Sequence, residues 1–180
     1  MSARHVALLR GVNVGRAKRV AMADLRALVA ALGYGGVRTL LNSGNVVYDA
    51  PAAEPPAASA ARIEAAIAER LGVRARVIAL SAAELSAVLA DDPFGALADD
   101  PSRLLVAVYA HAADRARLDA LAARDWAPER LAVGARAAYL WCPDGISAGQ
   151  LAELAMRALG EGATTRNRAT LEKLHALAAG

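Results

Sequence analysis

The spacing of apolar and polar residues in the first half of the chain predicts the order strand, helix, strand, strand, helix, strand. Strands are expected where short apolar runs stand between turn residues, and helices where apolar residues recur three and four positions apart. The expected strands are residues 5–10, 37–41, 45–48 and 73–80, and the expected helices are 22–32 and 59–71. Residues 50–59, rich in proline and alanine, are expected to form a loop or mobile linker, with Ser59 capping the second helix.

The second half of the chain repeats this order. Its expected strands are residues 104–109, 131–133, 137–141 and a short segment around 164, and its expected helices are 113–124 and 151–159. A further helix is expected between the halves, and another at the C-terminus. Ser81 with Glu84, and Ser147 with Gln150, have the spacing of a capping box, in which each residue of the pair bonds the backbone of the other where a helix begins.

The repeated order indicates a fold class. The order β-α-β-β-α-β is that of ferredoxin-like domains, in which helices cover one face of an antiparallel sheet. We therefore expect an α+β protein of two ferredoxin-like halves with antiparallel sheets, an internal duplication at the level of topology, packed as one compact unit. The first half is expected at residues 1–80, a linking helix and loop at 81–102, and the second half with a C-terminal helix at 103–180.

Composition narrows the class of protein. The 180 residues are 56% hydrophobic and 22% charged, which excludes a chain that is disordered throughout. Cys142 is the single cysteine, so an internal disulfide and a cysteine-based zinc site are excluded, and the histidines form no ligand-spaced pair. No signal peptide and no purely apolar stretch of membrane-spanning length is found, so we expect a cytoplasmic protein without a membrane partner, metal or cofactor.

Charge is weak overall and concentrated in one place. The formal net charge is +3, which is far from the dense basic stripe of a dedicated DNA-binding protein. Residues 10–19, however, contain four cations and no acid. These cations are Arg10, Arg16, Lys18 and Arg19. We refer to residues 10–19 as the basic loop, and an anionic partner is expected to be attracted there.

The basic loop begins with the first candidate binding segment, Arg10-Gly11-Val12-Asn13-Val14-Gly15. A glycine-containing loop between a strand and a helix presents backbone N–H groups to an anion. The candidate ligand-binding residues are Arg10, Gly11, Asn13 and Gly15. Their spacing fits neither a P-loop nor the dinucleotide-binding fingerprint. The alternative is a plain connection between a strand and a helix.

Two further segments are candidates for ligand binding. Asn42-Ser43-Gly44-Asn45 is an expected hairpin turn, in which Ser43, Gly44 and Asn45 are the candidate binding residues. They would lie near the end of the first strand if strands one and three are neighbours, and the alternative is a plain turn. The other segment precedes the last helix and consists of Thr164, Thr165, Arg166 and Asn167. Its hydroxyls, guanidinium and amide suit a carboxylate or phosphate, and the alternative is that Thr165 or Asn167 caps the helix.

No pair of a nucleophile and a base is evident. Cys142 is expected to be an inert buried thiol, and His5 and His175 are expected to be surface or packing residues. Asp91-Asp92 and Asp99-Asp100 are expected in solvated turns, because acid–base or metal chemistry needs convergent ligands that the sequence does not show. Pro143-Asp144-Gly145 is most simply a turn, in which Asp144 could orient an arginine.

These segments together resemble a known family. Residues 6–15, Met22-Ala-Asp-Leu-Arg26 and Ser43-Gly-Asn-Val-Val47 are similar to the N-terminal signature of the domain of unknown function 1697 family. Tyr139-Leu-Trp-Cys-Pro-Asp-Gly145, Ala163-Thr-Thr-Arg-Asn167 and Lys173-Leu174 are similar to its C-terminal signature. The resemblance implies two ferredoxin-like halves and no reaction, because the function of the family is unassigned.

The sequence departs from the family pattern in two places. Arg168 stands where the family usually has tryptophan, and Ala148-Gly149-Gln150 stands where it commonly has a serine and a lysine before the leucine. A ligand contact that relatives make through that lysine or tryptophan would be altered in this chain.

Four functions remain open, and the oligomeric state is not indicated. The favoured one is binding of a small anionic ligand, a nucleotide or phosphorylated metabolite, by the three polar segments. The second is binding of single-stranded RNA or DNA, although the first and third strands are poor in the aromatic residues that stack bases. The third is an enzyme acting on the same ligand, with Asp24, Asp144 or Lys18 as acid or base. The fourth is a structural or interaction protein without a ligand.

Overall fold

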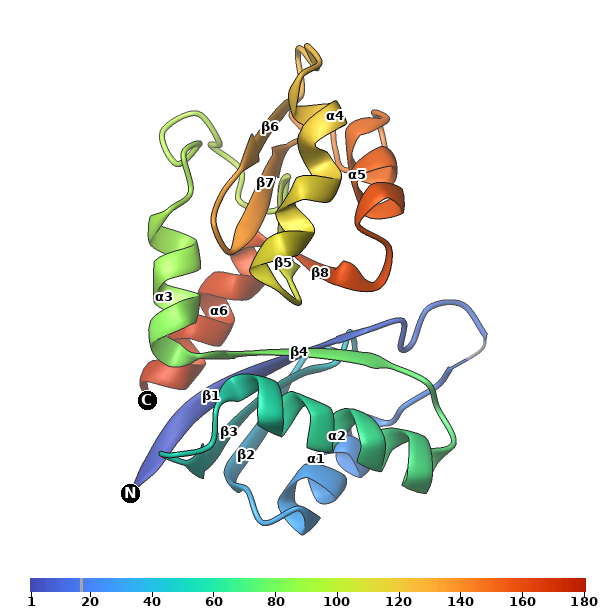
Figure 1. Cartoon of the computed structure of the whole chain (residues 1–180), viewed down its shortest axis with the longest axis vertical. Coiled ribbons are helices and arrows are strands. Elements are labelled where there is room, and N and C mark those ends of the chain that lie inside the picture. Colours follow the sequence, from blue (N-terminus) through green and yellow to red (C-terminus); the bar gives the residue numbers. More distant parts are fainter. Residues whose placement is uncertain (17) are drawn as a thin grey trace. The chain divides into compact units, whose positions relative to one another are not determined.

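The computed structural model describes residues 1–16 and 18–180, and Ala17, within the basic loop, lies outside the described residues. The chain divides into two compact units. The first comprises Met1–Ser86 with Leu174–Gly180, and the second is Ala87–Lys173. The chain enters the second unit within helix α3 (Ala82–Ala90) and returns to the first within helix α6 (Arg168–Ala179) (Figure 1).

The first unit is a four-stranded antiparallel sheet with two helices on one face (Figure 1). Its strands are β1 (Ser2–Arg10), β2 (Gly35–Leu40), β3 (Asn45–Pro51) and β4 (Arg76–Ser81), and its helices are α1 (Met22–Ala31) and α2 (Pro56–Leu71). The strand order is β2-β3-β1-β4, so β1 lies between β3 and β4. Leu8, for example, faces Asn45 on one side and Ile78 on the other. This is the ferredoxin-like order that the sequence predicts.

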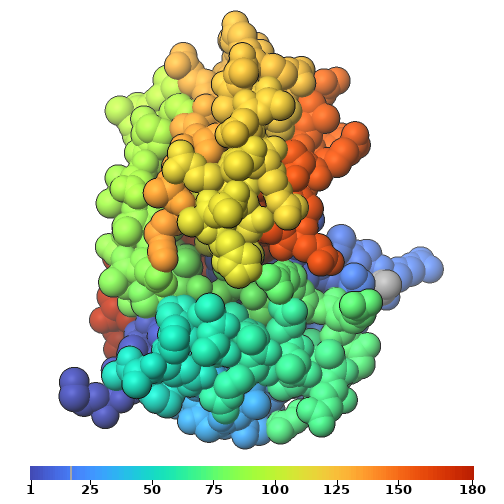
Figure 2. Space-filling model, in the orientation of Figure 1, coloured from blue at the N-terminus to red at the C-terminus, as the bar shows by residue number. Residues whose placement is uncertain are grey.

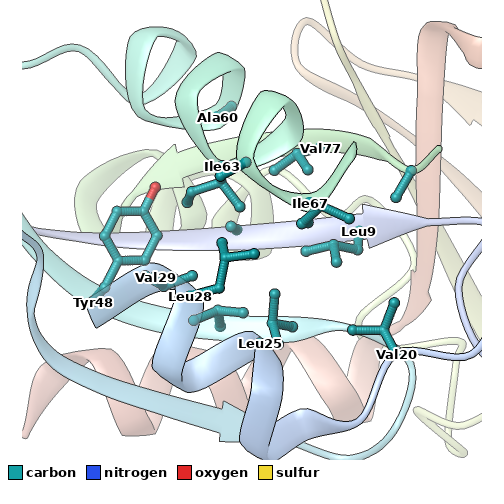
Figure 3. Packing of buried hydrophobic residues seen from close by; sticks show 14 of the residues in the cluster. Leu9, Val20, Leu25, Leu28, Val29, Tyr48, Ala60, Ile63, Ile67 and Val77 are labelled. Carbon is teal, nitrogen blue, oxygen red and sulfur yellow. The ribbon is translucent and has the colours of Figure 1, made fainter. Parts of the chain in front are cut away.

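The core of the first unit lies between the two helices and the sheet (Figure 3). Helix α1 presents Leu25, Leu28 and Val29, and α2 presents Ile63 and Ile67, at the three- and four-residue spacing of one helix face. The sheet meets them with alternate residues of its strands, which include Leu9, Val46, Tyr48 and Val77. His5 is buried beside these residues, which confirms a packing role for it.

The second unit repeats the arrangement, with the strand order β6-β7-β5-β8. Its strands are β5 (Leu104–Tyr109), β6 (Arg130–Val133), β7 (Ala137–Trp141) and β8 (Ala163–Asn167). Its helical segments are η1 (Ala112–Leu118), α4 (Asp119–Ala122), α5 (Leu151–Leu159) and η2 (Gly160–Gly162), where η denotes a 3-10 helix. Both halves of the predicted fold are therefore confirmed as ferredoxin-like.

One predicted helix has a different form. Residues 113–124 were expected to be a single α-helix, but the structure has a 3-10 helix followed by a single α-helical turn. The inward side chains are Leu118, which is buried, and Leu121, which is partly buried. Leu118 and Leu121 are three residues apart, a spacing that a 3-10 helix also places on one side. Two inward residues at that spacing therefore do not require the continuous apolar face of an α-helix.

The predicted linker at 50–59 is wrong in part. β3 continues to Pro51, and α2 begins at Pro56 because proline has the backbone angle of a first helical turn. Ser59 therefore lies inside α2 and is not its cap. Its buried hydroxyl donates to the Pro56 carbonyl (2.9 Å) and lies 2.7 Å from the Tyr48 hydroxyl.

Of the two predicted capping boxes, one is confirmed and one is wrong. The Ser81 N–H donates to Glu84 Oε2 (2.8 Å), and the Glu84 N–H donates to Ser81 Oγ (3.1 Å), where α3 begins. At α5 the N-cap residue Gln150 makes no side-chain cap. The Leu151 N–H instead donates to Glu129 Oε2 (3.4 Å), so a distant carboxylate takes the place of the local cap.

The prediction of a solvated turn is also wrong for Asp92. Its side chain is only 2% exposed and forms an ion pair with Arg168. Asp92 Oδ1 also accepts a hydrogen bond from the Phe94 N–H (2.8 Å). The two residues tie the segment after α3 to the first turn of α6.

Candidate anion-binding site

The described residues of the basic loop follow the end of β1 and project from the first unit (lighter blue, at the right of Figure 2). Asn13 braces it. The Asn13 Nδ2 amine donates to the carbonyls of Val20 (2.9 Å) and Asn42 (2.6 Å), and Asn13 Oδ1 accepts from the Val20 N–H (2.8 Å). The Asn13 backbone N–H donates to the Lys18 carbonyl (2.9 Å). Asn13 has φ 55°, a left-handed conformation that asparagine tolerates better than most residues.

The hairpin turn between β2 and β3 packs against the start of this loop. The Leu9 N–H donates to the Gly44 carbonyl (2.8 Å). A Cβ on Gly44 would lie 2.7 Å from Leu9 Cβ and 2.9 Å from Val12 Cγ2, and Gly44 has φ +84°, so the turn requires glycine there. The fully buried Asn45 donates to the Leu40 carbonyl and to Ser43 Oγ (both 2.8 Å). The structure thus brings the first two predicted segments side by side.

A hollow of about 440 Å³ lies where the loop enters α1. It is lined by Asn13, Arg19, Val20, Ala21, Met22 and Asn42. The first N–H groups of a helix have no partner within the helix and carry a partial positive charge. The N-cap residue of α1 is Ala21, and none of the described side chains caps this end. The hollow is therefore lined by the Arg19 side chain and by the uncapped N-terminus of α1.

The corresponding helix start in the second unit is closed by its own carboxylate. The N-cap residue of η1 is His111, and Asp114 Oδ2 accepts a hydrogen bond from the His111 N–H (3.0 Å) in a capping box. The ends of the two strands correspond, because the Tyr109 N–H donates to the Arg136 carbonyl (3.1 Å) just as the Leu9 N–H donates to the Gly44 carbonyl (2.8 Å). The helical segment that follows begins after residues 11–21 in the first half and after residues 110 and 111 in the second. One fold therefore carries a capped helix start in one half and an uncapped one in the other.

The third predicted segment forms β8 in the second unit. Arg166 is 9% exposed, and its Nη1 donates to Thr164 Oγ1 (3.1 Å) and to the Thr165 carbonyl (2.7 Å). Burial lowers the pKa of its guanidinium to about 10, because the charged form loses solvation. Asn167 Oδ1 accepts from the Thr170 N–H (2.9 Å), so Asn167 is the cap of α6 that the alternative interpretation expected.

Sequence reasoning missed part of the hollow. Arg19 belongs to the basic loop but was not among the expected binding residues, and Asn42, Val20, Ala21 and Met22 were not expected either. The absence of a serine, threonine, aspartate or asparagine directly before the helix is the signal that could have located it. Asn42 belongs to the predicted hairpin turn, but its place in the lining could not be predicted, because it depends on how the hairpin packs against the loop.

The other candidates for chemistry are buried or scattered. Cys142 is fully buried, and burial together with the nearby Glu129 carboxylate raises the pKa of its thiol to about 12, in agreement with an inert thiol. Asp24 and Asp144 are exposed. No group of three or more metal-ligating side chains is found in residues 1–16 and 18–180, and no helix in that part of the chain has the length and apolarity to span a membrane.

Nucleic-acid binding of the RNA-recognition type needs aromatic residues on the free face of the sheet. In the first unit the residues facing away from the helices on the two central strands are aliphatic or polar, and the aromatic Tyr48 faces the helices. In the second unit the residues facing away from the helices include Tyr139 and Trp141, but they are 2% and 6% exposed, and the Tyr139 hydroxyl donates to the Val88 carbonyl (2.6 Å). Neither sheet presents a stacking platform.

A family described as "Protein of unknown function (DUF1697)" matches residues 2–139. The chain belongs to the DUF1697 family. The resemblance drawn from the sequence signatures is thus confirmed. The conserved bacterial protein SP0830 from Streptococcus pneumoniae is similar in structure, with a TM-score of 0.80, 22% sequence identity and 99% of each chain covered.

At that level of identity the likeness to SP0830 shows the fold alone. No curated protein matches the sequence. The family description assigns no activity, so a function for this DUF1697 member has to be inferred from its own residues.

Proposed function

We propose that the chain binds a small anionic molecule, a nucleotide or a phosphorylated metabolite, with its phosphate group in the hollow at the start of α1. The observation that carries this proposal is the open N-terminus of α1 beside Arg19 in a hollow of about 440 Å³. Backbone N–H groups at a helix start and a guanidinium are both donors that suit phosphate. The space is in the range of small-molecule sites.

The difference between the two halves supports the same function. The ferredoxin-like fold does not need an uncapped first helix, because the second unit closes the start of its own first helical segment, η1, with Asp114. An uncapped helix start costs about 0.5–2 kcal/mol relative to a capped one. A phosphate that accepts the N–H hydrogen bonds would offset that cost when it binds.

Hydrogen bonds tie the start of the basic loop to Val20 and to the hairpin turn. The Asn13 side-chain amide donates two hydrogen bonds and accepts one, all to the backbone of the loop and the turn. We therefore propose that Asn13 holds the residues around the hollow in place and does not itself bind the ligand. Arg19 lines the hollow. Arg10, Arg16 and Lys18 add positive charge to the basic loop, which contains no acid between residues 10 and 19. The contribution of Thr164, Thr165, Arg166 and Asn167 to the same ligand stays a prediction.

Thermal-shift measurements with nucleotides, sugar phosphates and inorganic phosphate test the proposal. A ligand at a hundred times its Kd stabilises the folded state by about 2.7 kcal/mol, which corresponds to roughly 5–10 °C in a chain of this size. Arg19→Ala is expected to remove most of the shift. The matched control is Arg74→Ala, which removes the same charge from an exposed side chain of the same unit that does not line the hollow.

Two results would contradict the proposal. One is the absence of any shift with all phosphorylated probes. The other is an equal loss of shift in Arg19→Ala and Arg74→Ala, because the effect would then follow net charge and not the hollow.

A further inference from the structure

One polar side chain of the hollow has no role in the proposed phosphate contact. Asn42 lines the hollow together with Arg19, and it lies in the turn between β2 and β3. Its side chain is exposed and makes no hydrogen bond within residues 1–16 and 18–180. The other amide of the lining, that of Asn13, already donates two hydrogen bonds and accepts one. Asn42 is therefore the lining amide that a ligand can use.

The backbone of the turn holds Asn42 at this position. The Asn42 carbonyl accepts a hydrogen bond from Asn13 Nδ2 (2.6 Å), so the residue is tied to the basic loop through its main chain and not through its side chain. The residue before it, Leu41, has φ 58°, a left-handed conformation that is unfavourable for leucine. Leu41 is also 54% exposed, so burial of its own side chain does not account for this conformation. The turn thus fixes Asn42 against the loop and leaves its side-chain amide in the lining.

The hollow is larger than a phosphate group needs. Its volume of about 440 Å³ corresponds to about fifteen water molecules at about 30 Å³ each, whereas a phosphate group has five heavy atoms. A phosphate at the start of α1 would therefore leave room for several more heavy atoms of the same ligand. The body of the molecule attached to the phosphate would meet the rest of the lining.

The rest of the lining is apolar and carries no acid. Val20, Ala21 and Met22 supply the apolar part, and none of the described lining residues is acidic. The first acid after the basic loop, Asp24, is not among them. An ammonium group on the ligand would meet the Arg19 guanidinium and no carboxylate, so a cationic body is disfavoured. An amide has both donors and an acceptor, which suits a hydroxyl group, because a hydroxyl also donates and accepts.

We infer that Asn42 is the specificity-determining residue of the hollow and that it hydrogen-bonds a hydroxyl group of a phosphate ester with a neutral, hydroxyl-bearing body, such as a polyol phosphate or the sugar phosphate of a nucleotide. This inference rests on the proposed function, in which the phosphate group lies at the start of α1. Arg19 and the helix start meet the phosphate that all such esters share, so Asn42 decides among the esters. Phosphorylated amines and alkyl phosphates are the classes that the hollow disfavours.

Four small phosphates test the inference: inorganic phosphate, n-propyl phosphate, glycerol 3-phosphate and 2-aminoethyl phosphate. NMR titration of the ¹⁵N-labelled protein at constant ionic strength measures their affinities, including weak ones. Glycerol 3-phosphate and n-propyl phosphate share a three-carbon body and differ in two hydroxyl groups. The native protein is expected to bind glycerol 3-phosphate about three- to ten-fold more tightly than n-propyl phosphate, the effect of one net hydrogen bond. It should bind 2-aminoethyl phosphate more weakly than either.

Two variants of Asn42 remove the amide. Asn42→Ala is expected to bring the ratio of glycerol 3-phosphate affinity to n-propyl phosphate affinity to about one, with the affinity for inorganic phosphate close to native. Asn42→Leu should do the same, and because leucine is similar in size to asparagine, it separates loss of the amide from loss of bulk. The matched control is Gln150→Ala, which removes an exposed amide at the start of α5, outside the hollow, and should keep the native ratio.

The outcomes separate this inference from the proposed function. If Arg19→Ala weakens binding of inorganic phosphate but the native protein binds glycerol 3-phosphate no more tightly than n-propyl phosphate, the inference is wrong and the proposed function stands. A native ratio that persists in Asn42→Ala and Asn42→Leu also overturns the role of Asn42. Tightest binding of 2-aminoethyl phosphate would overturn the neutral body. If none of the four phosphates binds the native protein, the proposed function itself fails.

Discussion

Gly44 offers the sharpest test of how the candidate site is built, through the substitution Gly44→Ala. Its φ of +84° costs an alanine about 1 kcal/mol. The new methyl group would also lie 2.7 Å from Leu9 Cβ and 2.9 Å from Val12 Cγ2, and overpacking of this kind costs about 1–3 kcal/mol. Neither neighbour is the far end of a flexible side chain, so the turn must move. The expected loss in the free energy of unfolding is about 2–4 kcal/mol.

Gly15→Ala is the matched control, because Gly15 has φ +66° but nothing lies within 4 Å of its added Cβ. It should lose about 1 kcal/mol, from backbone strain alone. Urea unfolding measures both variants. With a slope of about 2 kcal/mol per molar urea, the midpoint should fall by about 1–2 M for Gly44→Ala and about 0.5 M for Gly15→Ala. Equal midpoints for the two variants would refute the close approach between the turn and β1.

Three further predictions concern single side chains. Burial lowers the pKa of His5 below 6.5, so the stability that neutral His5 contributes is complete above pH 6.5 and is lost as the pH falls toward the lower pKa of the folded state. Between pH 7.5 and pH 5.5 the free energy of unfolding in urea should therefore fall more for the native protein than for His5→Gln. Equal decreases for the two proteins would contradict the burial of His5. Cys142 should not react with a thiol reagent at pH 8 until urea unfolds the chain, since its pKa is about 12 and it is fully buried; rapid reaction of the folded protein would contradict this. Asp92→Asn should lower the free energy of unfolding by about 1–3 kcal/mol, because Arg168 loses its buried partner and keeps only Glu172, at 2.7 Å. Asp99→Asn, at an exposed position, should leave the free energy of unfolding nearly unchanged in the same assay.

The elements that follow from local spacing were predictable from the sequence. Leu25, Leu28 and Val29 lie on one helix face wherever the helix packs, and Gly72 ends α2 in the left-handed conformation that glycine favours. The fold class followed from the order of such elements, because few topologies accommodate two repeats of β-α-β-β-α-β. These predictions needed no knowledge of contacts between distant residues.

What could not be predicted depends on such contacts. Ser59 resembles a cap in sequence, but it is buried against Tyr48 from another element. Glu129 reaches the start of α5 from 22 residues away, which no local pattern shows. For the candidate site, the sequence indicates the basic loop and the turn, whereas the place of Asn42 in the hollow depends on how the hairpin packs against the loop.

The end of the chain has a consequence for the order in which the protein is made. Leu174–Gly180 belongs to the first unit, Leu174 is fully buried, and the Leu177 carbonyl accepts a hydrogen bond from Arg38 Nη2 (2.9 Å). During synthesis the N-terminal residues emerge first, but their unit lacks its last segment until residues 174–180 have been made. The second unit is complete in sequence before the first is, so the half that is synthesised first is the last to have all of its segments.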